Sequence, residues 1–268
     1  MDLSPDTGGL SRVTPFFIAV SGKGGTGKTT VSALLVQSLV EAGALPVLAV
    51  DADPNANLHE ALGVEVHETL GGMREEAFLK SIPPGMSRTD YIRYRFRRAL
   101  VESKGFDLIA MGRPEGQGCY CFANDLLQTC MRLLEKDYRF VIIDSEAGME
   151  HISRGTIGHP DLLLIVTDPG ARGMRTAARI VQIALAMGMS STPMRLVVNR
   201  TRDMRPATVP GLPDVIATIP EDPLVEAADL AAHPLVTLPP DAPARREISR
   251  LANLVLEMAQ NIDANRQP

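Results

Sequence analysis

The chain alternates short apolar runs with longer segments in which apolar residues recur every three or four positions. Seven runs lack regular polar alternation, which is typical of strands covered on both faces. These runs are 16–20, 47–50, 107–111, 140–143, 162–166, 195–198 and 215–219. The longer segments predict helices at 28–42, 123–135, 172–186, 223–230 and 244–260. Strands and helices in alternation predict an α/β fold with a doubly wound, mainly parallel sheet flanked by helices.

The same pattern predicts one large domain in the 268-residue chain. We expect a disordered leader at 1–14, a single domain over 15–262 and a polar tail at 263–268. The least regular stretch, 62–104, is interpreted as an insertion at one edge of the sheet. In a doubly wound sheet, ligands bind beyond the carboxyl ends of the strands, so motifs at those ends are the candidates for function.

Charge and apolar length exclude several functions. The chain has 27 basic and 32 acidic residues, a net charge of −5, which disfavours a general polyanion binder because such binding requires a basic face. We therefore expect no nucleic-acid partner. The longest aliphatic run, at 162–166, is far shorter than the roughly 20 residues that cross a bilayer. The prediction is a cytoplasmic protein with no membrane partner, in which cysteines stay reduced and serve metal binding or chemistry.

A glycine-rich loop follows the first strand and fits the G-x-x-x-x-G-K-[ST] pattern in full. Its glycines let backbone N–H groups surround a phosphate, and the helix that follows adds the positive end of its dipole. We expect Lys28 to reach the β and γ phosphates of ATP or ADP and the Thr29 hydroxyl to bind Mg²⁺. The nucleotide-binding residues are Gly22, Lys23, Gly24, Gly25, Thr26, Gly27, Lys28, Thr29 and Thr30.

Three aspartates end predicted strands next to this loop. Asp51 and Asp53 follow the second strand, where they are placed to hold Mg²⁺-bound water and a nucleophilic water. Asp53 also suits an Asx turn or a helix N-cap, and the two interpretations are compatible. Asp144 ends an apolar strand as a Walker B aspartate does, so we expect it in the Mg²⁺ shell. The sequence after it, Ser145-Glu146-Ala147-Gly148-Met149-Glu150-His151, occupies the place of a switch loop.

The loop has a second lysine, Lys23, in the form KGGxGK[ST], and here the chain resembles the deviant Walker A class of P-loop ATPases (ParA, MinD, nitrogenase iron protein) of the SIMIBI type. The resemblance implies a homodimer in which Lys23 crosses to the partner's nucleotide and Asp53 positions the attacking water. The catalytic residues are then Lys23, Lys28, Asp53 and Asp144. The same resemblance implies that the base is bound by Asn199 and by the segment Pro220-Glu221-Asp222.

The three cysteines divide into a pair and a single residue. Cys119 and Cys121 lie in a glycine-rich stretch between a strand and a helix, and bare C-x-C also suits two small apolar residues at such a junction. In a two-fold dimer, the pairs of both subunits would together supply four thiolate ligands, a set suited to Zn²⁺ or Ni²⁺. We interpret Cys130 as buried core. His151 and His159 are interpreted as loop histidines rather than additional ligands.

The block GRPEGxGCYCxAN together with DSEAGMEHISR is similar to the nickel-insertion accessory ATPases of the CooC/AcsF type. That resemblance implies an ATP-dependent metallochaperone that holds nickel or zinc between Cys119 and Cys121 of both subunits. Its partner would be the apo-enzyme of carbon monoxide dehydrogenase or acetyl-CoA synthase. The identity of the metal and of the target stays open.

Two other functions compete with this one: a ParA/MinD-type positioning ATPase, and an Fe–S-bridged reductase of the nitrogenase iron protein type. The paired cysteines favour the metallochaperone over the reductase, whose bridging cysteines stand singly. The basic and aromatic segment 88–98 is interpreted as a solvated helix face, with a docking surface for protein or nucleic acid as the alternative.

Overall fold

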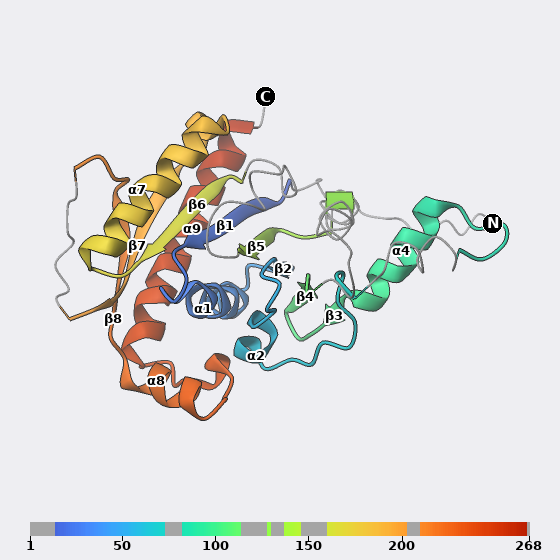
Figure 1. Ribbon diagram of the computed structural model, residues 1–268, viewed down its shortest axis with the longest axis horizontal. Coiled ribbons are helices and arrows are strands. Elements are labelled where there is room, and N and C mark those ends of the chain that lie inside the picture. Colours follow the sequence, from blue (N-terminus) through green and yellow to red (C-terminus); the bar gives the residue numbers. More distant parts are fainter. Residues whose placement is uncertain are drawn as a thin grey trace, which may run out of the picture.

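The computed structural model describes residues 14–72, 82–113, 128–129, 137–145, 160–202 and 210–266. An eight-stranded sheet forms its centre, in the order β3-β4-β2-β5-β1-β6-β7-β8 (Figure 1). All neighbouring strands are parallel except the edge pair β3 and β4. The strands are β1 (Phe16–Gly22), β2 (Val47–Asp51), β3 (Val101–Glu102), β4 (Phe106–Ala110), β5 (Phe140–Asp144), β6 (Leu162–Thr167), β7 (Met194–Thr201) and β8 (Val215–Pro220).

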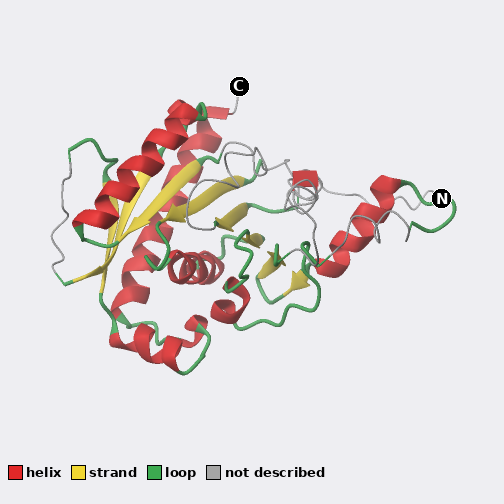
Figure 2. Ribbon diagram, in the orientation of Figure 1, coloured by secondary structure: helices red, strands yellow, loops and turns green. Residues whose placement is uncertain are grey.

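Helices cover both faces of this sheet (Figure 2). The helices are α1 (Lys28–Glu41), α2 (Leu58–Leu62), α4 (Arg88–Ala99), α7 (Ala171–Ala186), α8 (Pro223–Leu230) and α9 (Pro243–Arg266), with short 3-10 turns η1 (Met189–Ser191) and η2 (Leu235–Thr237). Side chains alternate between the two faces: Ile18 and Val20 of β1 pack with α1 and α9, whereas Ala19 packs with α7. This burial on both faces explains the lack of polar alternation in the strands.

The predicted α/β class and all seven predicted strands are confirmed, and several strands extend one to three residues further at their carboxyl ends. Most of the predicted helix 123–135 lies outside the described residues. The predicted end of the last helix at residue 260 is wrong, since α9 continues to Arg266. The sequence pattern missed β3 and α2, because elements of two and five residues are too short to show a period.

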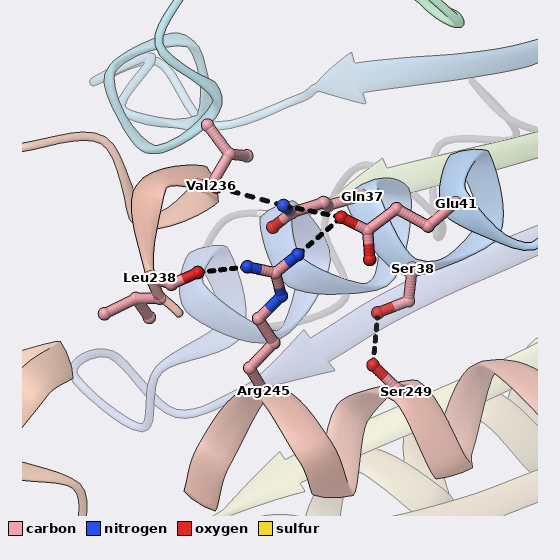
Figure 3. Close-up of polar contacts among 7 residues, drawn as sticks. All are labelled: Gln37, Ser38, Glu41, Val236, Leu238, Arg245 and Ser249. Carbon is pink, nitrogen blue, oxygen red and sulfur yellow. Dashed lines mark hydrogen bonds and ion pairs between the residues drawn. The ribbon is translucent and has the colours of Figure 1, made fainter. Parts of the chain in front are cut away.

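Helix α9 lies against α1 through apolar and polar contacts. Its residues Ile248, Leu251 and Val255 are fully buried in the core. Figure 3 shows the polar contacts, in which the buried Arg245 donates to the carbonyl of Leu238 and pairs with Glu41 of α1. Gln37 donates to Glu41 and to the carbonyl of Val236, both at 3.0 Å, and the Ser38 and Ser249 hydroxyls lie 3.2 Å apart. The buried apolar residues of α9 therefore serve core packing.

Replacing Arg245 with alanine is expected to lower the free energy of unfolding by about 1–3 kcal/mol, because the Leu238 carbonyl loses its donor in a buried setting. Glu41 is 47% exposed, so water can solvate its carboxylate once the arginine is gone, and Glu41→Ala should cost about 1 kcal/mol or less. Urea denaturation of both variants measures the difference. If both variants lost the same free energy of unfolding, the hydrogen bond from Arg245 to the Leu238 carbonyl would not be the larger contribution.

Among the described residues, no helix combines the length and the apolar character that spanning a membrane requires.

Candidate nucleotide-binding site

The loop between β1 and α1 has the backbone shape that a phosphate site needs. Gly27 occupies the N-cap position of α1 with φ +89°, a left-handed conformation that favours glycine. A Cβ at Gly27 would lie 2.2 Å from the Asn199 amide nitrogen, and one at Gly22 would lie 2.2 Å from the carbonyl oxygen of Val166. These two positions therefore require glycine for close packing of the loop against β6 and β7.

The N-terminus of α1 suits an anion. No side chain caps it, and the first N–H groups of any helix lack partners within the helix. They point, with the positive end of the helix dipole, to where the loop would place a phosphate. The loop is held from within, since the Thr26 hydroxyl donates to the Lys23 carbonyl at 2.8 Å. The residues present thus fit a nucleotide phosphate.

The two lysines of the loop lie in opposite environments. Lys28 is 8% exposed, and its charge acts on the carboxylate of Asp144. Lys23 is exposed at the surface, although its own carbonyl is fixed by Thr26. Lys28 is therefore buried next to the carboxylate of Asp144, whereas the Lys23 side chain is exposed to solvent.

Two predicted magnesium aspartates lie side by side because of strand register. Parallel pairing of β2 and β5 places Asp51 opposite Asp144, and both are buried. Asp144 accepts from the Thr29 hydroxyl at 2.6 Å and from the Ser32 hydroxyl at 3.2 Å. A threonine hydroxyl bonded to a strand-end aspartate is the donor set that holds Mg²⁺ in P-loop proteins. The structure thus brings Thr29 and Asp144 together as predicted.

Burial dominates the titration of these two carboxyls. Desolvation, with a further contribution from Asp144, raises the pKa of Asp51 to about 7. Desolvation also raises the pKa of Asp144 to about 6, against the lowering effects of the Thr29 hydrogen bond and the Lys28 charge. Asp51 accepts from the backbone N–H groups of Asp53 at 3.1 Å and Leu58 at 2.8 Å. A cation bound between these two buried carboxyl groups would stabilise their charged forms, so the pair favours cation binding.

The nucleotide-free protein is expected to lose stability as the pH rises from about 4 to about 7. Both carboxyls have a folded-state pKa above the unfolded value, so the folded chain holds more protons in this window and the free energy of unfolding falls on the order of a few kcal/mol. Chemical denaturation at several pH values measures the slope. Asp51→Asn should flatten it, and a stability that rises over the same window would contradict the assignment.

Asp53 lies in a turn beyond β2. Its carboxylate accepts from the backbone N–H of Asn55 at 2.8 Å and from the Asn55 side chain at 3.0 Å. The Asx turn that the sequence suggested is therefore confirmed, and the catalytic role of Asp53 stays a prediction. The Asn55 side chain also accepts from Arg113, which follows β4. This hydrogen bond ties the Asp53 turn to the segment after β4.

Asn199 supports the phosphate loop from β7. Its amide nitrogen donates to the Thr26 carbonyl at 2.8 Å, and its amide oxygen accepts from the backbone N–H of Arg200 at 2.9 Å. Arg200 has φ +54° and donates from its guanidinium to the Gly25 carbonyl at 3.1 Å. A left-handed arginine costs about 1–2 kcal/mol, which these contacts offset. In the structure described, Asn199 thus contacts the loop backbone, and its contact with adenine stays a prediction.

The second predicted base-binding segment has a structural role of its own. Asp222 is the N-cap of α8, accepting from the Leu224 N–H at 3.0 Å, and its other oxygen accepts from the Ala244 N–H of α9 at 2.9 Å. Glu221 is exposed and pairs with Arg202 at 2.9 Å. Asp222 thus joins the starts of two helices, so any contact of Pro220-Glu221-Asp222 with a base stays a prediction.

The predicted cargo-metal ligands Cys119 and Cys121 lie outside the described residues, as do Cys130, His151, His159 and the switch segment from Glu146 onward. Within the described ranges, no group of three or more His, Cys, Asp or Glu side chains is gathered as a metal would require. The sequence prediction for the cysteine pair therefore stands untested by geometry.

The structure adds three residues that the sequence prediction did not include. Ser32 is the second hydroxyl on Asp144, Arg200 holds the loop at Gly25, and Arg113 holds the Asp53 turn through Asn55. Ser32 could have been found, because it lies one helical turn after Thr29 on the same face. No sequence pattern indicated the roles of Arg113 and Arg200, because their contacts join segments that follow different strands at one edge of the sheet.

A phosphate loop at the end of a central parallel strand, with a threonine hydroxyl on a strand-end aspartate, defines a P-loop nucleotide-binding protein.

Comparison with known proteins agrees. The family model of the CobQ/CobB/MinD/ParA nucleotide binding domain matches residues 17–235. The chain is 39% identical over 251 residues to the "Uncharacterized ATP-binding protein MJ0685" of Methanocaldococcus jannaschii, covering 89% of this chain and 98% of that protein. It is 34% identical over 250 residues to the carbon monoxide dehydrogenase accessory protein CooC of Rhodospirillum rubrum, covering 83% and 90%. The chain belongs to the CobQ/CobB/MinD/ParA family of P-loop ATPases.

The fold is that of MinD. The septum site-determining protein MinD of Pyrococcus horikoshii, solved in complex with Mg-ADP, superposes with a TM-score of 0.67. The superposition covers 91% of this chain and 97% of that chain at 24% sequence identity.

Proposed function

We propose that this chain is an ATP-hydrolysing metallochaperone that binds nickel or zinc between two subunits and assists nickel insertion into carbon monoxide dehydrogenase or acetyl-CoA synthase. The observation on which the metal assignment rests is the 34% identity to CooC over most of both chains, together with the Cys119 and Cys121 pair. The cytoplasm, where thiols stay reduced, is the compartment that suits such a pair.

The nucleotide part of the proposal rests on the described site. We assign the β and γ phosphates of ATP to the N-terminus of α1 and to the buried Lys28, and the Mg²⁺ shell to Thr29 and Asp144. Bound Mg²⁺ would supply neutralisation of the charge that develops on the phosphates. Asp53, in its turn beyond β2, orients the attacking water. The exposed Lys23 acts on the nucleotide of the second subunit.

Each subunit contributes two thiolates to the cargo metal. Four thiolates at a two-fold axis form a closed tetrahedral set for Zn²⁺ and also accept Ni²⁺. One subunit supplies half of the set, so dimerisation governed by nucleotide also governs metal binding. Hydrolysis of ATP then separates the two subunits, and with them the two thiolate pairs, and releases nickel to the apo-enzyme.

Metal analysis of the protein purified without oxygen tests this proposal. With ATP or ADP and added Ni²⁺ or Zn²⁺, we expect about one metal ion per dimer, by elemental analysis of the dimer fraction. Cys119→Ser and Cys121→Ser should each lose the metal, whereas Cys130→Ser, the matched control on the third cysteine, should retain it. Metal retained in both variants, or a dimer without metal, would refute the proposal; iron with sulfide would favour the Fe–S reductase.

A positioning ATPase is the second candidate, since the fold is shared with MinD. A membrane cycle of that type requires an amphipathic helix free to lie on lipid. Ile248, Leu251 and Val255 of α9 are fully buried in the core instead, which favours the metallochaperone. Sedimentation with anionic phospholipid vesicles, with and without ATP, separates the two: ATP-dependent binding to vesicles would favour the positioning ATPase.

A further inference from the structure

Helix α4 is fixed to the sheet edge by one face only. Its C-terminal end is near β3 and β4, and the rest of the helix extends away from the sheet, at the opposite side of the view from α7 (Figure 1). Its residues Phe96 and Ala99 are buried in one apolar cluster with Ile109 and Met111, at the carboxyl end of β4. Ser87 is the N-cap of the helix, and its hydroxyl oxygen accepts from the Asp90 N–H at 3.1 Å. The C-terminal turn of the helix is therefore anchored at the edge of the sheet.

The opposite face of α4 is exposed and both basic and aromatic. We call Arg93, Tyr94, Arg97 and Arg98 the α4 outer face; all four are exposed, and they lie on one side because residues three and four apart are neighbours on a helix. Tyr94 is 50% exposed, and its ring stacks on that of Tyr91 at 6.2 Å. A large aromatic ring is thus exposed among cations at the surface.

Two of the five arginines of this helix share one carboxylate within the chain. Glu68 pairs with Arg95 and, at 3.6 Å, with Arg98. Asp90 is engaged by the Ser87 hydroxyl at the start of the helix. In the part of the chain that the structure describes, no carboxylate pairs with Arg93 or Arg97. The α4 outer face therefore keeps an excess of positive charge on a chain whose net charge is −5.

We propose that the α4 outer face docks onto an acidic surface of a folded protein partner. Resting on the proposed function, this partner is the nickel-free enzyme that receives the metal. Arginine and tyrosine are the residues enriched at the energetic centres of protein interfaces. Binding to nucleic acid requires several phosphate contacts to survive physiological salt, and two unpaired arginines on an acidic chain supply few of them.

The position of α4 suits delivery. The helix packs on Ile109 and Met111, and the next residues, Gly112 and Arg113, lead in sequence to the segment that contains Cys119 and Cys121. The Met111 N–H also donates to the Asp51 carbonyl at 2.8 Å. A partner bound to the α4 outer face would therefore contact a helix whose buried side packs next to the strand that leads, in sequence, to the cysteine segment.

Charge reversal tests this docking. The double variant Arg93→Glu/Arg97→Glu should weaken binding to nickel-free carbon monoxide dehydrogenase or acetyl-CoA synthase by about 30-fold or more, in surface plasmon resonance at about 0.1 M salt. The matched control, Arg175→Glu/Arg179→Glu, makes the same charge change at the same spacing on exposed positions of α7. The control should bind as wild type, and both variants should keep their melting temperature and ATP hydrolysis.

Each other outcome is decisive. Equal binding by wild type and the α4 variant would overturn the docking surface while leaving metal binding, and so the proposed function, intact. A wild-type protein that binds nickel but neither target enzyme overturns the docking inference, whereas a wild type that binds no nickel refutes the proposed function by its own test. Binding of duplex DNA by wild type, abolished in the α4 variant, would assign the surface to nucleic acid and overturn a protein partner.

Discussion

Replacing Lys23 with alanine is expected to reduce ATP hydrolysis by about 10³-fold, the scale on which cations supplied by a second protein act on phosphoryl transfer. The expectation rests on the two environments of the loop lysines: Lys28 is buried beside Asp144, whereas Lys23 is exposed. Because the Thr26 hydroxyl fixes the Lys23 carbonyl, loss of the side chain should leave the loop intact. Nucleotide affinity should therefore change far less than the rate.

Mixed dimers distinguish action across the interface from action within one subunit. When Lys23→Ala and Lys28→Ala subunits are mixed, each mixed dimer has one site with both lysines only if Lys23 acts on its partner. An equal mixture should then recover about a quarter of the wild-type rate, since half of the dimers are mixed and each has one complete site of two. No recovery above the two separate variants would show that Lys23 acts within its own subunit.

Replacing Asp144 with asparagine is expected to lower Mg²⁺-dependent hydrolysis by about 10²- to 10³-fold. The carboxylate accepts from Thr29 at 2.6 Å and from Ser32 at 3.2 Å, so the amide would remove the negative charge and orient a donor toward one of these hydroxyls. Asp144 is buried on a central strand. Its neighbour Asp51 on β2 already accepts from two backbone N–H groups, so we expect that it does not replace the lost carboxylate. The rate is measured by phosphate release over a range of Mg²⁺ concentrations.

Asp161 offers the matched control for this substitution. Its carboxylate accepts from the Phe17 N–H at 2.9 Å near the amino ends of the strands, away from the phosphate loop. Asp161→Asn should lower stability and leave the rate per folded molecule unchanged. Hydrolysis by Asp144→Asn at more than a tenth of the wild-type rate would remove Asp144 from the magnesium shell.

Local signals predicted the centre of this protein well. The buried strands and the phosphate loop are contiguous in sequence, so an apolar run before a glycine-rich motif predicted β1, the loop and α1 together. The pairing of Asp51 with Asp144 depends on the β2–β5 register, but both residues end buried strands, which indicated their shared edge.

Contacts between distant segments could not be predicted in the same way. Asn199 was assigned to a base by analogy with its class, and the structure shows its amide on the loop backbone. Asp222 was assigned likewise, and its two oxygens join the starts of α8 and α9. A single side chain gives no sequence signal that separates a ligand contact from a hydrogen bond across the fold, because both require the same polar atoms.

The α4 segment shows the same limit for surfaces. Its composition predicted a helix face that is either solvated or covered by a partner. The sequence pattern did not show which of its arginines pair with a carboxylate. The structure assigns Arg95 and Arg98 to Glu68 and leaves Arg93 and Arg97 outward. Which arginines of that face are paired depends on where the fold places Glu68, which precedes α4 in the sequence.

Transfer of nickel tests the central claim most directly. The protein, loaded with nickel and purified as a dimer, is mixed with nickel-free carbon monoxide dehydrogenase or acetyl-CoA synthase in the presence of Mg-ATP, and the activity of the target enzyme is followed. We predict activation that requires ATP and is lost with Lys28→Ala and with Cys119→Ser. Activation by nickel salt alone to the same extent, or unchanged activation by both variants, would contradict the account.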